Sequence, residues 1–158
     1  MKLQPPAGRA PDPSTPAERW RQVRAAAVLY GLVAAGTVIG GVARALVGLA
    51  TRAALDPAFP WDTALVNTLG SFLIGFYATL TEPDGRVFAS SRQRLFVMGG
   101  FCGGFTTFSI FSLDTLLLAR TGALSLAALN VGGSVAAWLL AVWVGYLLGS
   151  KLNRLGGA

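Results

Sequence analysis

Four long stretches of apolar residues, almost free of charge, dominate the pattern along this chain. They cover about residues 25–49, 62–81, 94–118 and 123–148. A helix needs about 20 consecutive apolar residues to cross a bilayer, and each stretch has that length. The pattern therefore predicts an all-α membrane protein with four transmembrane helices, and little chain is left for a separate soluble domain.

The polar segments between and beside these stretches predict the rest of the organisation. Residues 1–24 are proline-rich and end in a basic run, so we expect a disordered cytoplasmic tail whose end contacts an anionic membrane surface. The transmembrane domain is expected over residues 25–150, with a short basic C-terminal tail at 151–158. Residues 120–122 allow only a tight connection, which makes the third and fourth helices antiparallel neighbours.

Composition excludes several classes of protein. Charged residues make up 13% of the chain, there is no histidine, and Cys102 is the only cysteine. The commonest general base and metal ligand is therefore missing, and an enzyme is not expected. The net charge of +6 comes from basic residues that flank the apolar stretches, which is a membrane pattern rather than a nucleic-acid-binding one.

The third apolar stretch is expected to break near its middle. It contains four glycines within six positions, Gly99, Gly100, Gly103 and Gly104, and each weakens a helix by about 1 kcal/mol relative to alanine. A break inside a membrane frees backbone carbonyls, which must face protein or a wet cavity. The glycines thus indicate either a buried carbonyl-lined ion site near residues 103–107 or a packing seam for another helix.

Weak hydrogen-bond donors gather around this region. Phe108 and Phe111 share one helical face, and Ser109 and Ser112 form a hydroxyl row beside them. Phenyl edges carry partial positive charge, so the two rows together could solvate a small anion, although phenylalanines also simply pack. Asn67, in the middle of the second stretch, is either interhelical glue or a ligand group.

The segment from Gly100 to Ser112 closely resembles the signature of the CrcB/Fluc family of fluoride channels. The resemblance covers about residues 30–148, in the correct order and spacing, and leaves residues 1–24 outside. Three further features carry it: Gly40-Gly41-Val42-Ala43-Arg44 in the first helix, Val66-Asn67 to Gly70-Ser71-Phe72 in the second, and Asp114 soon after the phenylalanines.

The resemblance implies a passive, fluoride-selective channel subunit in the cell (inner or plasma) membrane, which exports fluoride and confers fluoride resistance. It implies an antiparallel, dual-topology dimer with two parallel pores. It also implies a structural sodium ion, not transported, held by backbone carbonyls of Gly103 and Thr106. The other residues carried over are the pore residues Asn67, Phe108, Phe111, Ser109 and Ser112, the vestibule residue Arg44 and, as a weaker addition, Ser134.

Two departures affect the finer makeup of the polar track. Ile110 stands where the family often has threonine, and Asn130 replaces a tyrosine that is common in the fourth helix. The alternative interpretation is a small four-helix drug/proton exporter, which needs an acid embedded in the membrane. Asp114 is its only candidate, and a non-transporting assembly factor would leave the glycines and their flanking donors unexplained.

The distribution of basic residues predicts one main orientation. With the N-terminus inside, ten lysines and arginines are expected to be cytoplasmic and two, Arg52 and Arg120, on the other side, with Arg44 inside the first span left uncounted. Such a bias favours a single topology, whereas a dual-topology homodimer should be nearly balanced. The partner is therefore either a second copy or a homologous chain of opposite bias.

Overall fold

The structure, a computed structural model, describes residues 15–83, 85 and 87–155. Within these residues, four helical segments are long and apolar enough to cross a membrane, Pro16–Ala54, Trp61–Leu80, Ser91–Arg120 and Leu124–Arg154, as the sequence predicts. The elements are α1 (Pro16–Ala54), α2 (Trp61–Leu80), α3 (Ser91–Arg94), the π-helical η1 (Leu95–Cys102), α4 (Gly103–Phe105), α5 (Phe108–Arg120) and α6 (Leu124–Leu155).

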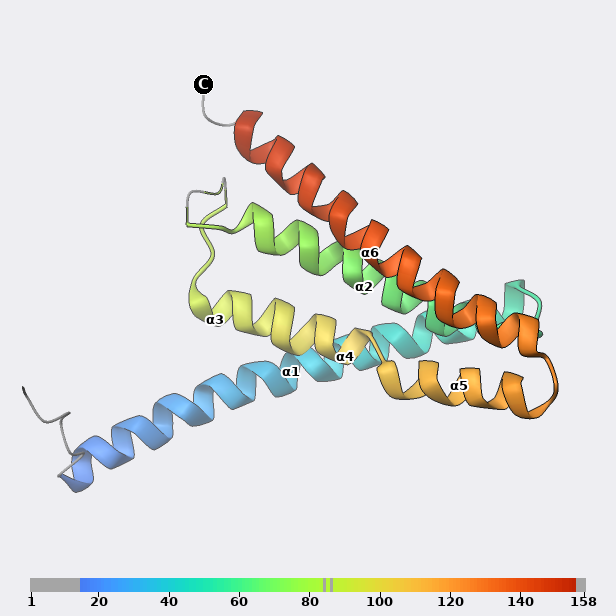
Figure 1. Cartoon of the computed structure of the whole chain (residues 1–158). Helices are drawn as coiled ribbons and strands as arrows, with labels where there is room; N and C mark the ends of the chain where they lie inside the picture. The colour runs from blue at the N-terminus through green and yellow to red at the C-terminus, as the bar shows by residue number, and fades with distance from the viewer. Residues whose placement is uncertain (1–14, 84, 86, 156–158) are drawn as a thin grey trace, which may run out of the picture.

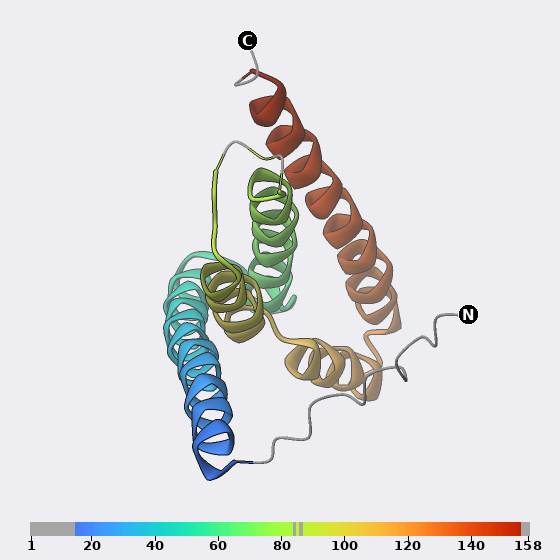
Figure 2. The ribbon, with the colours of Figure 1, turned by 90° about the vertical axis from the view of Figure 1, so that its left-hand side faces the viewer.

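The third helical segment, Ser91–Arg120, lies between two other helices. Its first half packs against α1, and its second half packs against α6. α1 lies along η1 and α4, while α6 packs along α2 and also covers α5 (Figure 1). Viewed from the end, α1 and α6 stand on opposite sides of the molecule (Figure 2). The start of α1, the start of α3 and the end of α6 lie at one end, as an even number of spans requires.

The first helix begins at Pro16, about nine residues before the expected start at Ala25. Thr15 caps it by accepting a hydrogen bond from the Glu18 amide, and proline occupies the first turn, where its missing N–H costs nothing. Residues 16–24 are therefore helical, which corrects the prediction of disorder there. The remainder of the predicted tail, residues 1–14, lies outside the described residues. At the other end, α6 continues into the predicted basic tail as far as Leu155.

Close approach between α1 and the third segment explains four glycines, Gly36, Gly40, Gly100 and Gly104. A Cβ added to Gly40 would lie 2.2 Å from the Phe101 carbonyl oxygen, and one added to Gly104 would lie 2.3 Å from the Thr37 carbonyl oxygen. All four glycines of the expected break are helical. Small residues here let two membrane helices touch backbone to backbone, so the packing-seam interpretation holds for Gly100 and Gly104.

The third segment is bent at Thr106–Thr107, hereafter the bend. Thr106 has φ −87° and ψ 162°, and Thr107 has φ −153° and ψ 119°, so both are extended residues between α4 and α5. β-Branched threonines suit this conformation. Farther along, Gly122 has a φ of +81°, which suits glycine, and the tight turn there makes α5 and α6 antiparallel neighbours, as predicted.

Candidate functional site

Asn67 fastens α2 to the bend through both ends of its side-chain amide. Its Nδ2 donates to the Thr107 carbonyl oxygen at 2.9 Å, and its Oδ1 accepts from the Thr107 amide at 2.7 Å. Asn67 is buried, so these bonds replace the pairing that Thr107 would have made inside a helix. The glue interpretation of Asn67 therefore holds, and one hydrogen of its amide nitrogen remains for another acceptor.

The C-terminal end of α4 presents carbonyl groups at the bend. The Thr107 amide, which would close the next helical turn on the Gly103 carbonyl, donates to Asn67 instead. Gly103 is exposed, and a Cβ added to it would meet nothing within 4 Å. The Thr106 carbonyl accepts from Arg44 Nη1 at 3.3 Å. The two carbonyls predicted as ion ligands thus belong to the same turn, and one of them already faces a guanidinium.

A cavity of about 300 Å³, hereafter the bend cavity, lies beside the bend between α2, the third segment and α6. It brings together four of the predicted site residues, Asn67, Gly103, Thr106 and Phe108. Its other lining residues include Ser71, Met98, Cys102, Thr107 and Trp138. Among the described residues of this wall, none carries a formal charge.

The two predicted pore phenylalanines adjoin each other but have different surroundings. Their ring centroids are 5.6 Å apart at 48°, as expected for neighbours three residues apart on α5. Phe108 is 72% exposed, whereas Phe111 is 6% exposed and meets Trp138 edge-on at 4.9 Å. The Phe108 ring thus faces outward from the single chain beside the bend cavity, whereas the Phe111 ring is packed in the protein interior.

The predicted hydroxyl row lies outside the bend cavity. Ser109 and Ser112 are both exposed. The Ser109 hydroxyl is 3.2 Å from that of Thr107, and the Ser112 hydroxyl donates to the Phe108 carbonyl at 2.9 Å. The Ser112 hydroxyl therefore donates within its own helix. Ser134 of α6 is buried.

Arg44 stands on the opposite side of the bend from the bend cavity. It lines a second cavity of about 410 Å³, together with Val66, Thr107 and Ile110. Thr107 is thus part of both cavity walls. Ile110, noted as a departure from the family pattern, contributes an apolar side chain to the arginine side.

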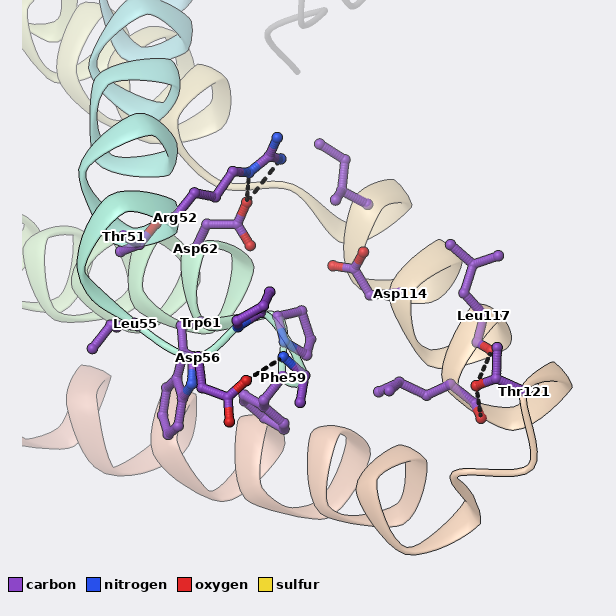
Figure 3. A pocket seen from close by; sticks show the side chains of 15 residues that line it. Thr51, Arg52, Leu55, Asp56, Phe59, Trp61, Asp62, Asp114, Leu117 and Thr121 are labelled. Carbon is purple, nitrogen blue, oxygen red and sulfur yellow. Dashed lines mark hydrogen bonds and ion pairs between the residues drawn. The ribbon is translucent and has the colours of Figure 1, made fainter.

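A third cavity, of about 390 Å³, opens at the end of the molecule where the α1–α2 loop meets α5 (Figure 3). Arg52 and Asp62 form an ion pair there at 3.1 Å. Asp114 lies across from them and accepts from the Thr63 hydroxyl at 2.7 Å. The acid proposed for an exporter thus sits at the molecular end, in a cavity that contains none of the predicted pore residues.

Two residues that sequence reasoning passed over are central to this geometry. Thr107 caps α5 by accepting from the Ile110 amide at 3.3 Å, besides its two bonds to Asn67. A threonine before a helical run is a recognisable N-cap signal. Trp138 borders the bend cavity from α6, and an indole inside an apolar span offers one polar group that needs a partner.

Residues 31–146 match the family described as CrcB-like protein, Camphor Resistance (CrcB). The chain belongs to the CrcB family. It is 58% identical over 136 residues to "Fluoride-specific ion channel FluC 1" of Rhodopseudomonas palustris (strain BisB18), which covers 86% of this chain and 96% of that one. It is 52% identical over 139 residues to the protein of the same name from Bradyrhizobium diazoefficiens, covering 88% and 94%.

The match to the CrcB family spans the bend and the residues around it. "Fluoride-specific ion channel FluC" of Paramagnetospirillum magneticum is 52% identical over 125 residues, covering 79% of this chain and 98% of its own length. The matched range, 31–146, contains Arg44, Asn67, the bend and Trp138. Together with the four apolar helical segments, the family makes this chain a multi-pass membrane protein.

Proposed function

We propose that this chain is a subunit of a passive, fluoride-selective channel, not an enzyme, in the inner or plasma membrane. The observation that carries the proposal is its 58% identity, over 86% of its length, to a relative named as a fluoride-specific ion channel. Such a channel lets fluoride leave the cytoplasm down its gradient, which lowers cytoplasmic fluoride and confers fluoride resistance.

The uncharged bend cavity supports conduction of a small anion. The Asn67 amide and the Phe108 ring edge offer weak positive potential there, and α5 begins at the same point with the positive end of its dipole. An arginine side chain in direct contact with the ion would hold fluoride too long, because conduction needs exit to be as easy as entry. We therefore assign fluoride to a path that passes Asn67, Phe108 and Phe111. The ion then meets Ser109 and Ser112 on the outer face of α5.

A structural sodium ion fits the carbonyl end of α4. Gly103 and Thr106 supply uncharged backbone oxygens, which suit a hard monovalent cation, and the space beside Gly103 is open. Bound there, the ion would supply a fixed positive charge beside the pore. Arg44 donates to the same Thr106 oxygen. When the ion binds, the arginine must therefore share that carbonyl with it or turn into the second cavity, which we assign to the vestibule.

An antiparallel dimer would complete the site. Gly103 and 72% of the Phe108 side chain are exposed in the single chain, yet backbone polar groups at a bend must be covered by protein within a bilayer. A second copy, or a homologous chain of opposite orientation, would cover them and place two equivalent bends together.

The exporter alternative depends on Asp114. That carboxylate is bonded to Thr63 and lies in the end cavity, away from the centre of the described spans. A carrier that exchanges protons for substrate needs an acid that both sides can reach in turn. The geometry therefore favours the channel.

Cells that lack their own fluoride export test the proposal. Expression of this chain, with its partner where one is needed, should lower their cytoplasmic fluoride and restore growth in fluoride medium. Asp114→Asn should keep most of that protection in a channel and abolish it in a proton-coupled carrier. Unchanged fluoride sensitivity, with the protein present in the membrane, would contradict the proposal.

A further inference from the structure

Trp138 carries a polar group for which the described residues offer no partner. Its indole Nε1 is buried and makes no hydrogen bond. The side chain lies in the wall of the bend cavity, together with Asn67 and Phe108, and its ring meets the edge of Phe111. The side chain that carries the unmatched donor therefore borders the proposed pore.

An indole N–H can only donate, so only an acceptor can satisfy it. Leaving a donor unpaired is costly in a region without water, which makes an orphaned N–H rare unless something else binds it. The wall of the bend cavity has no acidic side chain among its described residues. The missing acceptor is therefore a water molecule, an anion that enters the cavity, or a group of the second subunit proposed to cover this face.

Asn130 carries the other buried polar atom of α6 that lacks a hydrogen-bond partner, but it cannot accept from the Trp138 N–H. Its Nδ2 donates to the Thr115 hydroxyl at 2.9 Å, and that hydroxyl donates to the Phe111 carbonyl. The Asn130 Oδ1 is thus left as a buried acceptor. Eight residues separate it from Trp138, about 12 Å along the helix, too far for a hydrogen bond.

We propose that the Trp138 indole N–H is a direct ligand of the permeating anion, and the inference rests on the proposed function. Trp138 and Asn67 then offer N–H donors from different helices, α6 and α2, to one small ion. In the present arrangement Nε1 has almost no exposed surface, so the ion reaches it only when a neighbouring side chain moves.

Trp138→Phe tests the donor because it removes the N–H and keeps an aromatic ring. Fluoride flux through liposomes should fall about tenfold, the scale of one lost hydrogen bond to a charged group. Trp143→Phe is the matched control, since Trp143 lies on the same helix and is 57% exposed. It should conduct like the wild type.

A spectroscopic readout separates ligation from a packing effect. The chain has four tryptophans, and the indole N–H signal that Trp138→Phe deletes from the NMR spectrum belongs to Trp138. Titrating the wild type with sodium fluoride should shift that signal, whereas sodium chloride at equal ionic strength should not.

The outcomes distinguish this inference from the proposed function. If the wild type conducts fluoride and Trp138→Phe conducts equally well, the inference alone is overturned. The same holds if the wild type conducts but fluoride does not shift the Trp138 signal. Wild-type protein that passes no fluoride overturns both.

Discussion

At the scale of single residues, the bend depends on how Thr107 is held. Its amide and carbonyl both pair with Asn67, and its hydroxyl caps the first turn of α5. A residue with extended backbone inside a membrane would otherwise expose two polar groups, at a cost of several kcal/mol. Asn67 thus has a structural role, which is to stabilise the bend.

Asn67→Leu should destabilise the protein by about 3 kcal/mol, because it leaves the buried amide and carbonyl of Thr107 unpaired. Thermal unfolding in detergent measures this. Thr68→Val is the control: the Thr68 hydroxyl bonds only within its own helix, to Ala64, so its loss should cost no more than about 0.5 kcal/mol. If Asn67→Leu melts like the control, the clamp does not hold the bend.

The phenylalanine pair should separate conduction from packing. Phe108→Ile removes an exposed ring and should cut fluoride flux while unfolding changes by about 0.5 kcal/mol or less. Phe111→Ile also removes the edge contact to Trp138, and should lower stability by about 1–3 kcal/mol as well as flux. Flux and melting measured on both variants check this, and wild-type flux in both would assign the rings to packing alone.

At the scale of elements, backbone contact positions the third segment against α1. Gly36 on α1 faces Gly100, Gly40 lies against the Phe101 carbonyl, and Gly104 lies against Thr37 of α1, with no space for a methyl group at any of them. A similar contact joins α2 to α6, where a Cβ on Gly145 would lie 2.4 Å from the Phe72 carbonyl oxygen. The first seam holds η1 and α4 against α1, and the second holds α2 against α6, the helix that also covers α5.

Gly40→Ala should destabilise the protein by about 1–3 kcal/mol, because its methyl group would overlap the Phe101 carbonyl. Gly41→Ala adds the same atom one position along, where nothing lies within 4 Å. It should be neutral or gain up to about 1 kcal/mol from helix propensity. Equal melting temperatures for the two variants would contradict the seam.

The spans were predictable because crossing a membrane requires only a run of apolar residues. Their ends were less so: Thr15 and Glu18 form a helix-start signal, but the prolines before it made the tail look disordered through residue 24. The partner of Asn67 lies 40 residues away, and no periodicity connects them. The unmatched Trp138 N–H depends on side-chain packing, which a one-dimensional pattern does not contain.

At the scale of the whole molecule, the proposed dimer depends on surfaces that the single chain leaves exposed. The exposed backbone at Gly103 needs protein cover in lipid. Charge favours one orientation, since the sequence predicts ten basic residues on one side and two on the other, with Arg44 inside the first span uncounted. An antiparallel dimer therefore needs either a minority of inverted copies or an inverted homologue.

Cysteine accessibility of the two termini in whole cells distinguishes these cases. The only native cysteine, Cys102, is buried, so introduced cysteines are read against little background. Mixed orientations with fluoride flux would support a homodimer. One orientation without flux, restored by a second homologous chain, would support a heterodimer, and a conducting parallel dimer would contradict both.

Ion flux from liposomes that contain the purified protein, with its partner where one is needed, tests the central claim most directly. Fluoride-loaded vesicles should release fluoride when an ionophore relieves the voltage, at a rate independent of any imposed proton gradient. Chloride-loaded vesicles should release no more than protein-free vesicles do. Equal chloride release, or fluoride release that stops without a proton gradient, would contradict a passive fluoride-selective channel.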